Sequence, residues 1–185
     1  MSTEPLAQAI ATTRAVLAGV TPADLSKDTP CASWKVSDLI NHIIGAQAFF
    51  TSGLTGAPPA GATDPAAGDF LAVYDDVSNA CLTAFSAEGA MDKTYTLPFG
   101  QMPGPAFLGI ATTDTFTHGW DLARALGQST DLAPDLAAGL LAGAKMAIPP
   151  SFRGEEGKAA FGAEQTAPDG ACAADQLAAF LGRTV

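Results

Sequence analysis

The segment 105–126 constrains the fold most, because a helical pattern there carries two polar side chains on one face. Pro105 suits the first position of a helix, where its missing N–H is not needed, and Gly127 suits the position after the last turn. Asp114 and His118 are four residues apart, so in a helix their side chains project from one face about a turn apart. The sequence therefore places a carboxylate and an imidazole close enough together to bind one metal ion.

The apolar residues of this segment lie near the same face, which turns the two polar side chains toward the core. They are Phe107, Ile110, Ala111 and Leu122. A buried carboxylate and imidazole need a partner, since burial without one is costly. Two ligands hold a metal weakly, and the other of the two histidines, His42, lies in a second helical pattern. His42, Asp114 and His118 therefore form the candidate metal site. The alternative is a metal-free protein in which Asp114 and His118 hydrogen-bond each other.

Helical periodicity recurs along most of the chain. The main amphipathic patterns cover residues 4–20, about 36–50, 70–85 and 105–126, and further helices are expected at 134–148 and 173–181. Four main amphipathic helices predict an all-α four-helix bundle with an additional short helix and extended loops. Metal sites in such bundles are built from facing side chains. At 185 residues, we expect a single domain over residues 1–185.

Three stretches are predicted to lack regular structure. Residues 52–68 and 151–169 are rich in glycine, proline or polar residues, which break helices and strands. Thr94–Gly100 alternates briefly like a strand. Pro98 and the nearby Pro103 nevertheless favour an extended loop, because proline cannot donate to a sheet.

The composition excludes several kinds of partner. The net charge of −10, with nine scattered Lys and Arg residues, argues against binding to nucleic acid or anionic lipid. No apolar run is long enough to cross a bilayer, and the N-terminus does not have the pattern of a signal peptide. Three widely spaced cysteines indicate neither a disulfide framework nor a structural zinc site. We expect a cytoplasmic protein, and a homodimer is a reasonable expectation for a helical bundle.

Other residues near these motifs are given structural interpretations. Asp121 and Arg124 form an oppositely charged i, i+3 pair, which predicts local helix stabilisation. Trp120 is expected to pack in the core. Arg153 is expected to be a solvated surface residue, with pairing to an anionic substrate as the alternative. Cys31 is interpreted as structural and not as a fourth metal ligand.

Three segments together resemble a known family. They are Thr29–His42, His118–Gly127 and Leu177–Arg183. These resemble the actinobacterial DinB-like proteins, specifically the metal-binding domain of mycothiol-dependent maleylpyruvate isomerase and its single-domain relatives. The resemblance implies a DinB/YfiT-like four-helix bundle with a divalent metal, zinc or nickel, held by His42, Asp114 and His118. Many relatives have His or Glu where this chain has the shorter Asp114. We expect no counterpart of the isomerase's second domain, so its substrate specificity is not carried over.

Three protein ligands leave a coordination position open, as in catalytic metal sites. The predicted function is a metal-dependent thiol S-transferase or isomerase, with mycothiol as the thiol and a small-molecule electrophile as the other substrate. A thiol placed at the ion would be deprotonated and become nucleophilic. The main alternative is a non-catalytic metal-binding module, such as a sensor or an interaction protein. A hydrolase and a non-haem iron site are weaker alternatives, because no spare histidine could act as a base and because of the fold context.

Overall fold

The computed structural model describes residues 2–31, 33–59, 64–154, 159 and 161–185. Within these residues the chain forms six α-helices, four short 3₁₀ turns and one two-stranded sheet. The helices are α1 Glu4–Leu17, α2 Val36–Thr55, α3 Phe70–Ser86, α4 Gly104–Leu126, α5 Pro134–Ala147 and α6 Ala173–Phe180, and the strands are β1 Thr94–Leu97 and β2 Gly100–Pro103. The predicted all-α, DinB-like fold is confirmed. None of the described helices is both long and apolar enough to cross a membrane.

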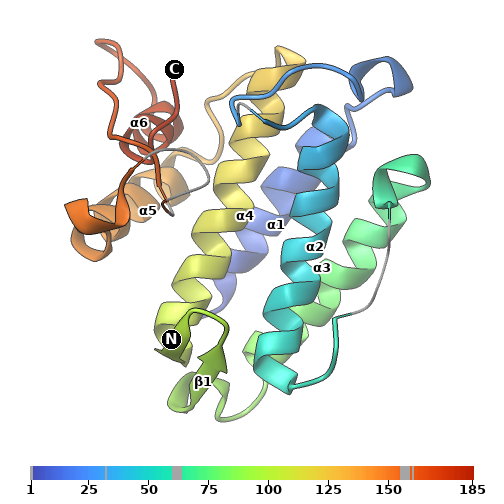
Figure 1. Cartoon of the computed structure of the whole chain (residues 1–185), viewed down its shortest axis with the longest axis vertical. Coiled ribbons are helices and arrows are strands. Elements are labelled where there is room, and N and C mark those ends of the chain that lie inside the picture. The colour runs from blue at the N-terminus through green and yellow to red at the C-terminus, as the bar shows by residue number, and fades with distance from the viewer. Residues whose placement is uncertain (1, 32, 60–63, 155–158, 160) are drawn as a thin grey trace.

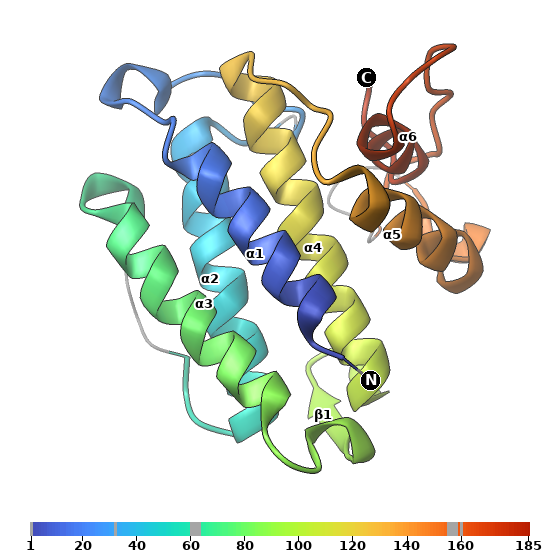
Figure 2. The ribbon, with the colours of Figure 1, turned by 180° about the vertical axis from the view of Figure 1, so that it is seen from behind.

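Helices α1 to α4 lie side by side and form the bundle (Figures 1 and 2). Helices α1 and α4 run in one direction, and α2 and α3 run in the other. The connection from α2 to α3 therefore returns along the bundle, and its described part is anchored on α2. The Asn41 amide nitrogen donates to Asp64 at 3.0 Å, and the Asn41 amide oxygen accepts from the backbone N–H of Ala66 at 2.9 Å.

The register of α1, α2 and α4 is fixed by a buried polar contact at Thr115. The Gln47 side chain donates to Thr115 Oγ1 at 2.7 Å, and Thr13 Oγ1 donates to the Thr115 carbonyl at 2.9 Å. Gly119 allows α1 to approach α4 at this level, because a Cβ there would clash with the Thr13 hydroxyl. Buried hydrogen bonds of this kind are costly to leave unmade, so they hold one relative position of the helices.

Apolar side chains fill the bundle above and below this contact. One cluster, around Leu39, Ile40 and Tyr74, includes side chains from all four helices of the bundle. Another, around Phe85 and Phe107, lies near strand β1. All five side chains are at most 1% exposed. Because burial of a large apolar side chain contributes about 1.5–3 kcal/mol, these clusters supply most of the rigidity that positions a site between the helices.

The predicted loop at Thr94–Gly100 is wrong, because the chain forms a β-hairpin there. Strand β1 pairs antiparallel with β2, with Thr94 opposite Pro103 and Leu97 opposite Gly100. Pro98 lies in the turn between the strands, and Pro103 ends the second strand, so neither proline removes a central ladder hydrogen bond. The hairpin lies at the foot of α2 and α4 (Figure 1).

Two predicted boundaries also move. Helix α2 ends at Thr55 and is capped by Gly56, whose φ of +72° suits glycine. The loop predicted from residue 52 therefore begins after residue 55. Helix α1 ends at Leu17, and residues 18–20 form the turn that follows it. Part of the predicted 52–68 and 151–169 loops lies outside the described residues.

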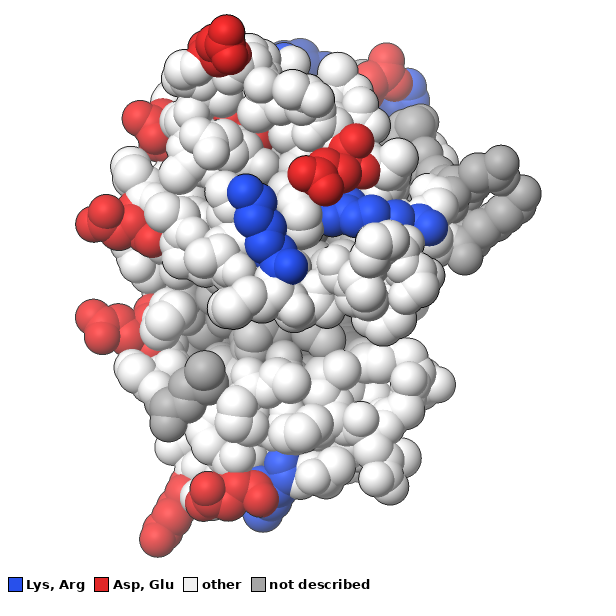
Figure 3. Space-filling view, turned by 90° about the vertical axis from the view of Figure 1, so that its left-hand side faces the viewer, with Lys and Arg blue, Asp and Glu red and all other residues white. Residues whose placement is uncertain are grey.

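Helices α5 and α6 pack against each other beside α4 (Figure 2). Trp120 is 1% exposed and donates from Nε1 to Asp175 at 2.8 Å, which confirms its packing role. Arg153 is not a solvated side chain, because its guanidinium donates to the carbonyl of Phe180 at 2.7 Å and stacks over that ring. On the face shown in Figure 3, acidic and basic side chains are interspersed.

Candidate metal centre

The structure brings together the three residues that the sequence selected. His42 on α2 faces Asp114 and His118 on α4, and Asp114 Oδ1 lies 3.8 Å from His42 Nε2 and 3.6 Å from His118 Nε2. A set of ligand atoms, one from each residue, lies within 4.8 Å. Asp114 and His118 share a helix face because they are four residues apart. The contact between Gln47 and Thr115 holds His42 opposite them.

These residues fit a divalent metal. Zinc binds nitrogen and oxygen at about 2.0–2.1 Å, so neighbouring ligand atoms of a tetrahedral site are about 3.3 Å apart. The observed separations of 3.6 and 3.8 Å need only a small contraction. His42 Nε2 is buried and makes no hydrogen bond among the described residues, so an unpaired nitrogen is directed into the site. At 3.6 Å, Asp114 and His118 do not form the hydrogen bond that the metal-free alternative requires.

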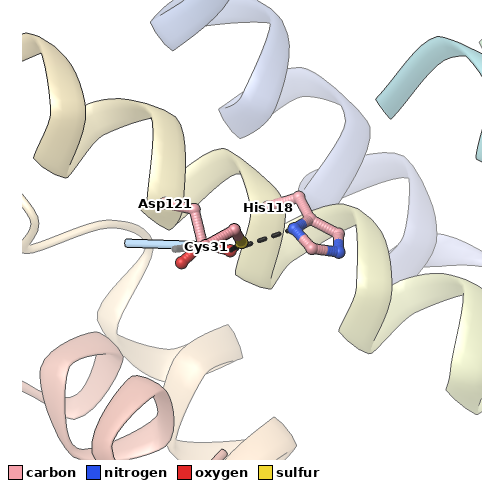
Figure 4. Close-up of side chains that lie close together, drawn as sticks. All are labelled: Cys31, His118 and Asp121. Atoms are coloured by element: carbon pink, nitrogen blue, oxygen red, sulfur yellow. Dashed lines mark hydrogen bonds and ion pairs between the residues drawn. The ribbon is translucent and has the colours of Figure 1, made fainter. Parts of the chain in front are cut away.

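One ring nitrogen of His118, Nδ1, is engaged in a hydrogen bond with a carboxylate. His118 Nδ1 lies 2.9 Å from Asp121 Oδ2. Figure 4 shows this nitrogen facing Asp121 and the second ring nitrogen pointing away from it. A carboxylate that holds one nitrogen of a histidine fixes the ring orientation and leaves the other nitrogen free to bind a metal. The geometry therefore assigns Nε2 of His118 to the candidate site.

The predicted pairing of Asp121 with Arg124 is wrong. Asp121 is fully buried, whereas Arg124 is exposed. Arg183, which follows α6, donates to both carboxylate oxygens of Asp121, from Nε at 3.2 Å and from Nη2 at 3.0 Å. Asp121 is turned away from Arg124, and its cationic partner from outside α4 is Arg183 of the C-terminal segment.

Cys31 completes this buried polar cluster. Its thiol donates to Asp121 Oδ2 at 3.5 Å, and Cys31, His118 and Asp121 form a second group with closely spaced potential ligand atoms (Figure 4). Both oxygens of Asp121 already accept hydrogen bonds, and the guanidinium of Arg183 disfavours a second cation there. We therefore interpret this group as the support of His118.

Charged neighbours shift the pKa values of His118, Asp121 and Asp114 away from their usual ranges. Burial acts to lower the pKa of His118, but its hydrogen bond to Asp121 and the neighbouring carboxylates raise that pKa to about 10. Burial acts to raise the pKa of Asp121, yet His118 and Arg183 lower it to about 2. The pKa of Asp114 is also lowered, because the two imidazoles outweigh its burial.

Two residues around the site had no assigned role in the sequence analysis. The Trp34 ring packs at a tilt against both imidazoles, with its centroid 4.6 Å from that of His42 and 5.7 Å from that of His118, and so shields one side of the site. Arg183 is the other. Both lie in the segments that carry the family resemblance, and that was the only sequence signal for them. Arg183 is separated from Asp121 by 62 residues, so spacing could not link them.

A groove of about 400 Å³ opens beside the candidate metal site. Its lining consists of His42, Gly45, Ala46, Phe49, Phe50, Phe99, Ile110 and Asp114. His42 and Asp114 are the two candidate ligands in this lining. Ile110 was expected to face the core, but it is 39% exposed and forms part of the groove wall.

Fold and donor set together define a DinB-like helical bundle with a candidate metal site between its second and fourth helices. The chain belongs to the family described as the mycothiol maleylpyruvate isomerase N-terminal domain, whose sequence profile matches residues 6–123. The resemblance stated from the sequence is thus confirmed.

Similar proteins occur in Mycobacterium tuberculosis. Two proteins described as uncharacterized, from strains CDC 1551 / Oshkosh and H37Rv, are each 45% identical to the chain over 172 residues. The alignments cover 92% of this chain and 91% of each relative. No solved structure is significantly similar to the chain.

Proposed function

We propose that this protein is a divalent-metal-dependent enzyme that joins a low-molecular-weight thiol to a small electrophile, as an S-transferase or as the first step of an isomerisation. The observation that carries the proposal is the convergence of three donor side chains, two of which, His42 and Asp114, line one end of an open groove. The family description supports mycothiol as the thiol.

The residues of the site have distinct roles in this proposal. His42, Asp114 and His118 would hold the ion, zinc or nickel, through two imidazole nitrogens and one carboxylate oxygen. A bound divalent ion would supply the Lewis acidity that makes a thiol anionic at neutral pH. Asp121 keeps the Nδ1 proton of His118 in place, and Arg183 balances the charge of Asp121.

The S–H bond breaks, and one bond forms between the thiol sulfur and an electrophilic carbon. In an addition, the π electron pair of that carbon moves to the neighbouring atom, which takes up a proton; in a substitution, the leaving group departs with its bonding pair and the thiol proton goes to solvent. The groove would hold the electrophile against the site, so that the two reactants meet in one orientation. An isomerisation would then break the same carbon–sulfur bond and release the thiol unchanged.

A non-catalytic metal-binding module is the alternative that the groove makes less attractive. A sealed site would suit a sensor or a storage protein, whereas a cleft of about 400 Å³ beside two of the donors suits substrate binding.

The first test is the metal content of protein purified without a metal-affinity tag. We expect about one equivalent of zinc or nickel in the wild type, a large loss in His42→Ala and Asp114→Ala, and no loss in Asp76→Ala, which removes an exposed carboxylate from α3. The metal-loaded protein should then consume mycothiol and an electrophile together. Absence of metal after incubation with divalent ions would overturn the proposal, and metal binding without thiol consumption would favour the module.

A further inference from the structure

The groove extends from the candidate metal site along the facing sides of α2 and α4. On α2, His42, Ala46 and Phe49 follow the i, i+4, i+7 spacing of one stripe, and on α4, Ile110 and Asp114 are four residues apart. The two stripes face each other. The candidate ligands thus stand at one end of a wall that is otherwise apolar.

Small side chains create the space in this wall. Gly45 and Ala46 stand where larger residues would close the gap between α2 and α4. A Cβ added at Gly45 would meet no atom within 4 Å, so the volume beside this residue is open. The groove volume of about 400 Å³ falls in the range of small-molecule sites, about 300–1,000 Å³.

Aromatic rings form the far end of the groove. Phe99, in the turn of the hairpin, is 60% exposed, and its ring centroid lies 6.2 Å from that of Phe49. The Phe49 ring in turn lies 5.7 Å from that of Phe50. Phe50 is buried, whereas Phe99 and the half-buried Phe49 leave aromatic surface open to solvent beside the groove. Such surface favours binding of an apolar ligand, since burying it is favourable.

The charges around the groove select against an anionic ligand. None of the lining residues is Lys or Arg, and Asp114 is the one carboxylate among them. Away from His42 and Asp114, a substrate carboxylate would lose part of its hydration against Gly45, Phe49, Phe99 and Ile110 without gaining a cation. Burying an unpaired charge in this way costs more than the apolar contacts return.

We propose that this groove binds an uncharged small molecule with an aromatic or bulky apolar body, and that such a molecule is the electrophile of the reaction. The second half of this statement rests on the proposed function, whereas binding to the groove requires neither metal nor thiol. The proposal assigns the substrate class to apolar electrophiles and excludes dicarboxylates.

The test uses two dyes that share one ring system. N-phenyl-1-naphthylamine is uncharged, and 8-anilino-1-naphthalenesulfonate carries a sulfonate. Titration of each into the metal-free full chain, followed by fluorescence, should show one tight site for the uncharged dye and at least about tenfold weaker binding of the anionic one, a difference of about 1.4 kcal/mol.

Two pairs of variants locate the site. Gly45→Leu places a side chain in the open groove and improves helix propensity, so the protein should fold and bind the uncharged dye at least about tenfold more weakly. Gly139→Leu is the matched control, because Gly139 on α5 also has open space around it. Phe99→Ser should weaken binding about threefold or more, while Phe152→Ser, which removes a ring that is 54% exposed elsewhere, should not.

Equal affinity for the two dyes, or an unchanged affinity in Gly45→Leu, would overturn the inference. The outcome is separable from that of the proposed function. Specific dye binding without any thiol transfer would contradict the enzyme and keep the apolar groove. Thiol transfer restricted to dicarboxylate electrophiles would keep the enzyme and refute the apolar substrate class.

Discussion

The two sides of His118 differ in how completely their polar groups are paired. On the Nδ1 side, Asp121 is fully buried and accepts from His118, Arg183 and Cys31. On the Nε2 side, Asp114 lies 3.6 Å or more from both imidazoles, and the adjacent groove is open. One side is a closed hydrogen-bonded support, and the other is an incomplete set of donors.

This difference separates support from binding. A buried group that is fully paired has nothing left to offer a ligand, whereas buried donors without partners carry a cost that a ligand can remove. Substitutions on the closed side should therefore reduce the stability of the protein. Substitutions on the open side should reduce metal binding and leave the fold intact.

The largest effect is expected from Arg183→Met. The side chain of Arg183 is 16% exposed and pairs with a carboxylate that is fully buried, so its loss removes one cationic partner and two hydrogen bonds from Asp121. We expect the free energy of unfolding, measured by urea denaturation, to fall by about 3–5 kcal/mol. Arg124→Met, on the surface of the same helix as Asp121, should change it by less than about 0.5 kcal/mol. Similar small losses in both variants would contradict the support role of Arg183.

His42→Ala should have the opposite profile. Its Nε2 makes no hydrogen bond among the described residues, so metal-free stability should change by less than about 1 kcal/mol. Metal affinity, measured by competition with a chelating dye, should fall at least about a hundredfold, the upper end of losses for residues that only support a ligand. Ser52→Ala, near the far end of the same helix, serves as the control and should leave metal affinity unchanged. A strongly destabilised His42→Ala would show that the open side also carries the fold.

The stability of the metal-free protein and its affinity for metal should change with pH in opposite directions. Because the pKa of His118 is raised from 6.5 to about 10 in the metal-free protein, its contribution to stability is complete below pH 6.5 and is lost as the pH rises to about 10. A metal must displace a proton from Nε2, so its apparent affinity should rise about tenfold per pH unit between about pH 6 and 8. Calorimetry in two buffers of different ionisation enthalpy counts the released protons. Binding without proton release would contradict this assignment.

The smallest effect is expected from Cys31→Ser. The thiol is a weak donor 3.5 Å from Asp121, and a serine hydroxyl can replace it. Thermal denaturation should show a loss below about 1 kcal/mol, smaller than that of Cys81→Ser, which places a hydroxyl in a fully buried apolar cluster. If Cys31→Ser cost as much as Arg183→Met, the thiol would be an essential member of the support.

The sequence could single out three candidate ligands that lie together in the structure because the relation between two of them is local. Asp114 and His118 are separated by one helical turn, and the chain has only one other histidine to complete the set. The error at Asp121 has the same origin. Arg124 is its neighbour in sequence, but the buried face of α4 turns Asp121 toward Arg183, which lies 62 residues away. The hairpin was missed because the effect of a proline depends on its place in the ladder.

The sequence by itself determined the helices, their apolar faces and the choice of His42, Asp114 and His118, because helical periodicity and side-chain spacing are local properties. Only the tertiary structure decided which carboxylate supports His118, and that Ile110 and Phe99 border an open groove. Those outcomes depend on how α2, α4, the hairpin and the C-terminal segment pack. Packing depends on long-range contacts whose partners the spacing of residues along the chain does not reveal.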